Sequence, residues 1–537
     1  MAERTSDSDV NRTPAAPSPH NADSDRAPPS SLDEEARVVG PPQTAGYVAK
    51  SKEEEALVRK IDCYLLPTIW IMYLCSYMDR TNIGNAKIAG MTQDLEMDSD
   101  MYSTALVVFF VGYVVFEVPS NMALSRTRPS VFLPTIMFLW GVLTTAMGFV
   151  PTYGALVGLR AAIGALEAGF APGILLLFNS WYRIEEQSVR FAVYISAAIL
   201  SGAFGGLLAG GIVTGLDGLA GIEGWRWLFI IEGIATVCVA SASRFILLDF
   251  PANTKRLSER ERVLAVKRLG ADTPGGEKRE MALMAPPPSS SAPAATLLTS
   301  NSHMSASRRM KTPPPSGIKP SPSHIRALKM VLKEWRTWLL VLGYMAIVGS
   351  STLSYFYPTL VQGLGYTSVQ MAQYMVVPIY GSAFVATVCV GWVADRHLRR
   401  RRPILAAACM TLATACALAV VGCAHASPGA AFAGRYALLV VMASALWAAN
   451  ALALSIASIT FLAAFPGEDG VGPRAVGLAL VNAMGNLAQI YGAYLFPSED
   501  APGYLLGFGV IAGMCFVGLS AFASLEVLLR KRPGAAK

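Results

Sequence analysis

Charged residues in two apolar stretches of the sequence have types and spacings that could bind an anion and carry protons. Asp79 and Arg80 are neighbours in the first stretch, and Arg160 and Glu167 lie seven positions apart in the fourth. Because an α-helix has about 3.6 residues per turn, Arg160 and Glu167 return to nearly the same face, roughly 10 Å apart along the axis. A planar guanidinium group can hold a carboxylate ligand through paired hydrogen bonds, and a carboxylate can take up a proton.

These charges need a reason, because a charged side chain inside a membrane span is energetically costly. The first half of the chain also contains Glu117, two positions before Pro119, and Glu232. We interpret Glu117 as a gating or structural ion-pair residue and Glu232 as a structural residue. One alternative stays open for Arg160 and Glu167, which could simply pair with neighbouring helices and hold the bundle together.

Apolar stretches recur along the chain at the length that a membrane-spanning helix needs. Of 537 residues, 53% are hydrophobic and only 15% are charged, and a spanning helix needs about 20 apolar residues. We therefore expect an all-α membrane protein with twelve transmembrane helices in two six-helix halves. The expected helices cover residues 61–84, 101–124, 131–150, 154–178, 190–215, 226–248, 336–358, 369–394, 403–424, 435–463, 474–496 and 503–529.

A long polar segment separates the two sets of helices. We therefore expect five parts: a disordered cytoplasmic tail (1–55), an N-terminal bundle (56–250), a partly disordered cytoplasmic loop (251–334), a C-terminal bundle (335–530) and a cytoplasmic tail (531–537). In transporters built from two such halves, the binding site lies between them near the midplane. Three polar side chains of the second half could complete a site of this kind or only bond between helices: Tyr355, Asn450 and Asn482.

Basic residues gather in the loops on one side of the expected bundle, among them Arg183, Arg190 and Arg396. Loops rich in Lys and Arg stay in the cytoplasm, so we expect both termini there. The net charge of +7 is accounted for by these loop residues, which orient the protein in the membrane. It therefore gives no reason to expect a nucleic-acid partner. The eight cysteines form no CxxC pair, and no hydrolase or nucleotide-binding motif occurs, so we expect neither an enzyme nor a bound metal or cofactor.

Several longer motifs carry a resemblance to a known family. The first half contains DRTNIGNA at 79–86, FEVPSN at 116–121 and RAAIGALEAGFAPG at 160–173. In the second half, GWVADR at 391–396 resembles the loop signature of the major facilitator superfamily. Together, these segments resemble the anion:cation symporter family of that superfamily, in its fungal allantoate permease and nicotinate transporter-like branch.

The resemblance implies a twelve-helix major facilitator fold and a proton-coupled importer of a small organic anion. The substrate would be a monocarboxylate such as nicotinate, allantoate or a related vitamin or nitrogen compound. The residues carried over by position are Asp79 and Glu167 for proton coupling, Arg80 with Tyr77 and Tyr113 for the substrate carboxylate, and Arg160 for balancing Glu167. Asp395 and Arg396 of the loop signature join Arg160 and Glu117 as expected residues of charge balance or gating.

Two features depart from the family pattern. Residues 451–473 are longer and more apolar than the expected connection between the tenth and eleventh helices, and the first-half loop lacks the Asp of the signature. Two other functions stay open, a nutrient sensor without net transport and an exporter or exchanger of a small organic solute. We expect a monomer in the plasma membrane, with protons and the lipid bilayer as partners beside the substrate.

Overall fold

A computed structural model describes residues 51–531 except for 126, 252, 255, 271–323, 367, 399–400, 424–427 and 467–470. The N-terminal tail, the centre of the polar loop and the last six residues lie outside this description, so the predictions made for them stay predictions.

The described residues form helices and no strand. In the first half these are α1 (Lys52–Ala86), η1 (Lys87–Met91), α2 (Thr92–Asp94), α3 (Ser99–Ser125), α4 (Pro129–Met147), α5 (Tyr153–Glu167), α6 (Phe170–Trp181), α7 (Ile184–Leu216), η2 (Leu219–Gly221) and α8 (Gly224–Ile246). The second half contains α12 (Trp335–Ser351), η3 (Thr352–Phe356), α13 (Tyr357–Gly363), α14 (Val369–Tyr374), α15 (Val376–Arg396), α16 (Arg402–Gly422), α17 (Pro428–Ala464), α18 (Val471–Gly492), η5 (Ser498–Asp500) and α19 (Leu505–Lys531).

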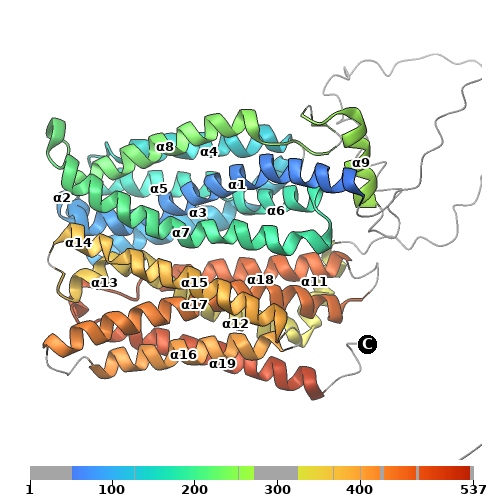
Figure 1. The fold of residues 1–537 in the computed structure, drawn as a ribbon. Helices are drawn as coiled ribbons and strands as arrows, with labels where there is room; N and C mark the ends of the chain where they lie inside the picture. Colours follow the sequence, from blue (N-terminus) through green and yellow to red (C-terminus); the bar gives the residue numbers. More distant parts are fainter. Residues whose placement is uncertain are drawn as a thin grey trace, which may run out of the picture. The chain divides into compact units, whose positions relative to one another are not determined.

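Eleven segments of the described chain are helical, long and apolar enough to cross a membrane. The twelfth crossing is made by α18, which is 22 residues long and packs against α12 of its own half and α3 of the other. The expected all-α membrane protein with twelve transmembrane helices in two halves is therefore confirmed. Figure 1 shows the helices of the first half, in blue to green, beside those of the second half, in yellow to red.

The first helix begins at Lys52, earlier than the predicted start near residue 61. The Ser51 side chain accepts a hydrogen bond from the Glu54 backbone N–H at 3.2 Å, and Glu53 to Glu55 place negative charge in the first turn. Both features stabilise a helix N-terminus, because the first backbone N–H groups have no partner within the helix. The helix ends at a kink where Gly90 has a φ of 105°, which a residue without a side chain adopts easily.

Two predicted spans are broken near the residues of interest. In the fourth span, α5 ends at Glu167 and a new helix, α6, begins at Phe170. Gly169, between them, packs directly against the Ser120 hydroxyl group. The seventh span changes from α12 to the 3-10 turn η3 and then to α13, which places Tyr355 in the turn. Breaks of this kind are tolerated in membrane proteins where neighbouring helices cover the freed backbone groups.

The apolar stretch at 451–473 has a simple structural explanation. Helix α17 continues to Ala464 and is 37 residues long, so most of this stretch belongs to the tenth transmembrane helix. The connection to α18 is correspondingly shorter than the sequence suggested.

The ends of the polar central loop are helical. They form α9 (Glu259–Gly270) and α11 (His324–Lys333), and α9 packs against α1 and α6. Arg268 of α9 is fully buried, with its Nε 3.3 Å from Glu54 Oε1, and it also bonds to Glu186 at the start of α7. These ion pairs fix α9 to the N-terminal bundle.

The helices have two distinguishable ends. We call the end with α9 and the beginning of α1 the α9 end, and the end with η1, α2 and η5 the η1 end (Figure 1). At the η1 end the two halves bond to each other. Ser103 donates to the Ala493 carbonyl at 2.9 Å, and the Ser498 N–H donates to Ser99 Oγ at 2.9 Å.

Small residues bring the halves close together there. Gly202, Gly206 and Gly210 of α7 lie against α14 or α15, and a β-carbon at any of them would collide with its neighbour. The glycine spacing in this helix therefore serves close helix–helix contact.

Candidate functional site

Arg80 and Glu167 form a buried ion pair between the first and fourth spans. Arg80 Nε donates to Glu167 Oε1 at 2.8 Å, and the Arg80 and Glu167 side chains are only 9% and 1% exposed. The Ser76 hydroxyl group, one turn before Arg80 on α1, donates to the same oxygen. The second oxygen of Glu167, Oε2, is buried without a hydrogen-bond partner among the described residues.

Aromatic rings surround the Arg80 guanidinium group. Its Cζ atom lies 5.0 Å from the ring centre of Tyr77, 5.0 Å from that of Tyr113 and 5.5 Å from that of Phe109. Rings at these distances stabilise a cation in a dry environment while leaving its N–H groups available for hydrogen bonds. The structure thus brings together Arg80, Tyr77 and Tyr113, the three residues that the resemblance gave to the substrate carboxylate.

Asp79 points to a different place from its neighbour Arg80. Its Oδ2 accepts hydrogen bonds from Trp140 Nε1 of α4 and Thr236 Oγ1 of α8, each at 3.1 Å. Its Oδ1 is buried and has no partner among the described residues. Adjacent positions on a helix point about 100° apart, so one residue can face the other half while the next faces the interior of its own bundle.

Arg160 lies close to this group without bonding directly to Glu167. It is 2% exposed, its Nε donates to the Ala105 carbonyl at 3.4 Å, and its Cζ lies 4.7 Å from the Phe109 ring centre. Glu167 is among the groups that act on it electrostatically. The direct ion pair of Glu167 is therefore made with Arg80, and Arg160 can balance its charge only at longer range.

Tyr355 is the predicted second-half residue that packs next to the aromatic rings around Arg80. Its ring packs edge-on against Phe110, with the ring centres 5.9 Å apart, and Phe110 packs edge-on against Phe109, one of those rings. The Tyr355 hydroxyl group donates to Gln489 of α18 at 3.2 Å. Asn450 of α17 and Asn482 of α18 are half-buried, and neither side chain makes a hydrogen bond within the described residues.

The other residues expected for charge balance or gating, Glu117, Asp395 and Arg396, have different surroundings from Arg80. Glu117 is half-buried one turn beyond Tyr113, with no ion pair among the described residues. Asp395 bonds at 2.6 Å to Arg402, which also bonds to Ser455 of α17, so these contacts link α15, α16 and α17. Arg396 is exposed, with its Cζ atom 5.5 Å from the Trp392 ring centre.

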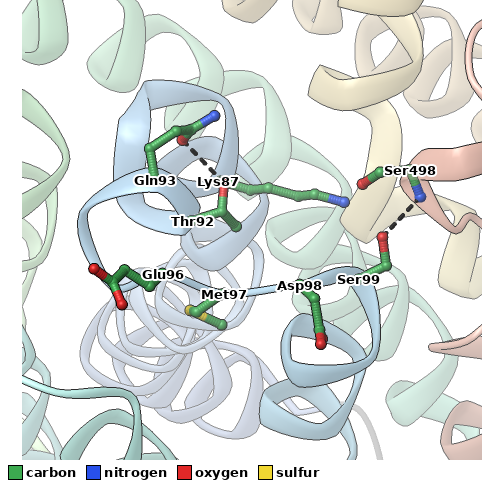
Figure 2. Close-up of a pocket in the computed structure, with 8 residues that line it drawn as sticks. All are labelled: Lys87, Thr92, Gln93, Glu96, Met97, Asp98, Ser99 and Ser498. Atoms are coloured by element: carbon green, nitrogen blue, oxygen red, sulfur yellow. Dashed lines mark hydrogen bonds between the residues drawn. The ribbon is translucent and has the colours of Figure 1, made fainter.

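A cavity of about 330 Å³ opens at the η1 end. Figure 2 shows the Lys87 side chain reaching across it toward Ser498 of the second half. The Lys87 ammonium group lies 4.3 Å from the Tyr102 ring centre and 5.5 Å from that of Phe356. Lys87 therefore takes part in the contact between the halves at the η1 end, apart from Arg80.

Sequence reasoning missed several residues that hold the charged groups in place. Ser76 could have been found, because it is four positions before Arg80 and so shares its helix face. Trp140, Thr236 and Gln489 come from other spans, and only the packing of the helices shows what they contact.

The arrangement would let the Arg80 guanidinium group change its partner from the Glu167 carboxylate to the carboxylate of a ligand. A guanidinium group held by a single carboxylate could release it when that carboxylate takes up a proton, and could then bond to the carboxylate of a ligand. Residues of both halves surround the site, so its access can change as the halves move.

Comparison with known proteins gives a consistent picture. The sequence profile of the Major Facilitator Superfamily matches residues 69–493. MFS transporter prlL of Fungal sp. (strain NRRL 50135) is 31% identical over 497 residues, covering 90% of this chain and 88% of that protein. A putative tartrate transporter of Agrobacterium vitis is 34% identical over 232 residues, covering 43% of this chain and 53% of that protein.

A solved structure shares the fold. The crystal structure of a bacterial homologue of the human lysosomal transporter Spinster superposes with a TM-score of 0.61 at 14% identity. The superposition covers 89% of this chain and 98% of the bacterial protein.

Proposed function

This chain belongs to the major facilitator superfamily and is a membrane transporter rather than an enzyme, and on that premise we propose that it imports a small organic anion together with protons. The anion is a carboxylate, and our first candidates are nicotinate, allantoate and related vitamin or nitrogen compounds. A relative named for tartrate supports a carboxylate substrate.

The observation that carries this proposal is the buried ion pair of Arg80 and Glu167. In the substrate-free protein, Glu167 occupies a guanidinium N–H that a substrate carboxylate would use. Protonation of Glu167 removes its charge and frees Arg80, so the anion binds when the proton does. Return of the Glu167 anion to Arg80 after proton release then displaces the substrate.

Electrical work sets a minimum for coupling. Moving one elementary charge across 100 mV corresponds to about 2.3 kcal/mol, so a monoanion is opposed by that amount when it enters an inside-negative cell. One proton makes the entrance of a monoanion electroneutral, and a second proton makes it favourable. Asp79 and Glu167 are the two coupling carboxyl groups in this proposal.

We place the protein in the plasma membrane as a monomer, with the α9 end and both termini in the cytoplasm. The Lys and Arg residues of the loops at the α9 end support this orientation. A cysteine placed at the exposed residue Glu499 of the η1 end should react with a membrane-impermeant thiol reagent in intact cells. If only a cysteine at Glu259 of α9 reacted, the orientation would be reversed.

The function is tested with purified protein in liposomes that carry an imposed pH gradient. Labelled nicotinate, allantoate and tartrate are offered outside, with nicotinamide as a neutral competitor. We expect accumulation that depends on an acidic outside, competition by unlabelled carboxylates and none by the amide. Exchange of internal for external substrate without any pH dependence would instead favour the exchanger, and binding without flux would favour the sensor.

The Glu167→Gln variant makes the test specific to the site. A glutamine cannot cycle a proton, so we expect substrate exchange to continue while pH-driven accumulation is lost. Glu259→Gln, an exposed acid of α9, serves as the matched control and should behave as wild type. Normal pH-driven accumulation by Glu167→Gln would show that this carboxyl group does not couple the proton.

A further inference from the structure

Glu232 is a buried acid for which the proposed mechanism has no use. It lies on α8, is 3% exposed, and neither of its side-chain oxygens has a hydrogen-bond partner among the described residues. The sequence suggested a structural role for Glu232, but an ion pair or hydrogen bond that served such a role would give it at least one partner. An ionised carboxylate in this place would be an uncompensated buried charge, which is strongly unfavourable, so the group is expected to hold a proton.

Asp79 of α1 and Glu232 of α8 lie on two helices that pack against each other, and the charge of Asp79 acts on Glu232. Thr236, one turn along α8 from Glu232, donates its hydroxyl hydrogen to Asp79 Oδ2 at 3.1 Å. The other oxygen of Asp79 is buried and has no hydrogen-bond partner within the part of the chain that the structure describes. Asp79 is also the one charged group found to act on Glu232 among the described residues.

The other groups around this pair do not neutralise it. Cys75 lies one turn before Asp79 on α1, and α4 contributes the neutral Trp140 side chain. Within the described residues, Glu167 and Arg160 of α5 both act on Asp79, and their charges have opposite sign. Two carboxyl groups that share a dry site with no paired cation cannot both be ionised.

We propose that Glu232 and Asp79 form a proton-binding pair that holds one proton and passes it between the two carboxyl groups. In the transfer, the O–H bond of the Glu232 carboxylic acid breaks and an O–H bond forms on the Asp79 carboxylate. Glu232 becomes the anion as Asp79 becomes the acid, and nothing else changes. The inference rests on the proposed function, because it supplies the second proton beside the one that separates Arg80 from Glu167.

The first test needs no substrate. Infrared spectra of the purified protein, recorded from mildly acidic to mildly alkaline pH, should contain the carbonyl band of a buried carboxylic acid. We expect the Glu232→Gln variant to lose this band and Glu259→Gln to keep it. An unchanged band in Glu232→Gln, with both variants monodisperse by size exclusion, would show that Glu232 holds no proton.

The Asp79→Asn variant tests the pairing and does not depend on folding of the Glu232 variant. Removing the neighbouring carboxyl group removes the repulsion that keeps Glu232 protonated, so the band should disappear at a lower pH than in wild type. A band that titrates as in wild type would overturn the pairing.

The second test measures coupling in liposomes. The pH gradient that just balances an opposed substrate gradient gives the number of protons per substrate. We expect this number to fall in Glu232→Gln and to stay constant in Glu259→Gln, and an unchanged number in Glu232→Gln would contradict the proposal. If the wild type carried no carboxylate, the proposed function would fail while the infrared titration still decided on the pair.

Discussion

Arg80 cannot give the same N–H group to Glu167 and to a substrate at once. Its Nε already donates to Glu167 Oε1 at 2.8 Å, inside a shell of three aromatic rings. In the proposed mechanism, competition at this one residue would link the protonation of an acid to the binding of an anion, and no movement of the backbone would be needed for the link itself.

Binding of a substrate carboxylate should therefore depend on the planar shape of the Arg80 guanidinium group more than on its positive charge. In an Arg80→Lys variant the positive charge remains, but the paired hydrogen bonds to a carboxylate are lost. Hydrogen bonds to charged groups contribute about 1.5–3 kcal/mol, so we expect KM for the carboxylate to rise by roughly tenfold or more. Uptake kinetics in liposomes measure this, with Arg260→Lys, at an exposed position of α9, as a matched control. Equal KM values for Arg80→Lys and wild type would place the substrate elsewhere.

Helix α1 contains both Asp79 and Arg80 and also takes part in the contact between the halves at the η1 end. It presents Asp79 to α4 and α8, Arg80 to α5, and Gly84 to the Tyr355 backbone of η3. One helix thus connects the acid, the guanidinium group and the contact with the second half. A change at Gly84 is expected to act on the contact alone.

A methyl group at Gly84 would collide with the Tyr355 carbonyl oxygen. We expect Gly84→Ala to destabilise the closed η1 end by about 1–3 kcal/mol, the usual cost of overpacking, and so to slow transport. Gly158→Ala on α5 is the control, since nothing lies within 4 Å of that position. Alanine in an open helical position is neutral or stabilising. Transport rates and thermal unfolding of the two purified variants decide the comparison, and equal rates would mean that the contact opens without cost.

Helix α9 is fixed to α1 by a pH-dependent contact. Lys60 Nζ lies 2.9 Å from Glu261 Oε1, and this hydrogen bond holds the pKa of the Glu261 carboxyl group below its ordinary value. A lowered pKa in the folded state stabilises it above the ordinary pKa of glutamate, and the contribution is lost as pH falls through the lowered pKa. The docking of α9 should therefore weaken in acid.

Hydrogen exchange of α9 amides, corrected for the intrinsic effect of pH, measures this docking. Protection should fall in acid in the wild type, whereas Glu261→Gln should show lower protection that varies less with pH. The exposed Glu259→Gln variant should follow the wild type. The same acid response in all three proteins would rule out the contribution of Glu261.

The two halves of the molecule are joined at the η1 end by hydrogen bonds such as that from the Ser498 N–H to Ser99 Oγ at 2.9 Å. Alternating access requires this end to open, since a site between the halves must face each side of the membrane in turn. Lys87 and the cavity beside it (Figure 2) lie at the same contact. Opening of this end would separate Lys87 from the Phe356 ring.

A covalent link across this contact should stop transport. We expect the double variant Ser99→Cys and Ser498→Cys to lose uptake when treated with a short, reducible bifunctional thiol reagent, and to recover after reduction. Each single variant, treated in the same way, controls for reaction at the native cysteines, of which Cys63, Cys238 and Cys389 are exposed. Full uptake by the linked protein would mean that the η1 end does not open.

The sequence by itself determined the class of the molecule. Apolar stretches of spanning length fix a twelve-helix membrane protein because lipid offers no partner to unpaired backbone groups. Charges in those stretches identified Arg80 and Glu167, because an isolated charge in a span needs a partner or a task.

Only the tertiary structure decided which charges meet. Periodicity shows that Arg160 and Glu167 share a face of one span, but Glu167 pairs with Arg80 of another, and Asp79 turns away to Trp140. Residue spacing shows which side chains share a face of a helix, but it does not show which other helix that face contacts. Partners from separate spans therefore cannot be predicted from spacing. The breaks after Glu167 and around Tyr355 were not predicted either, because both stretches are as apolar as an unbroken span.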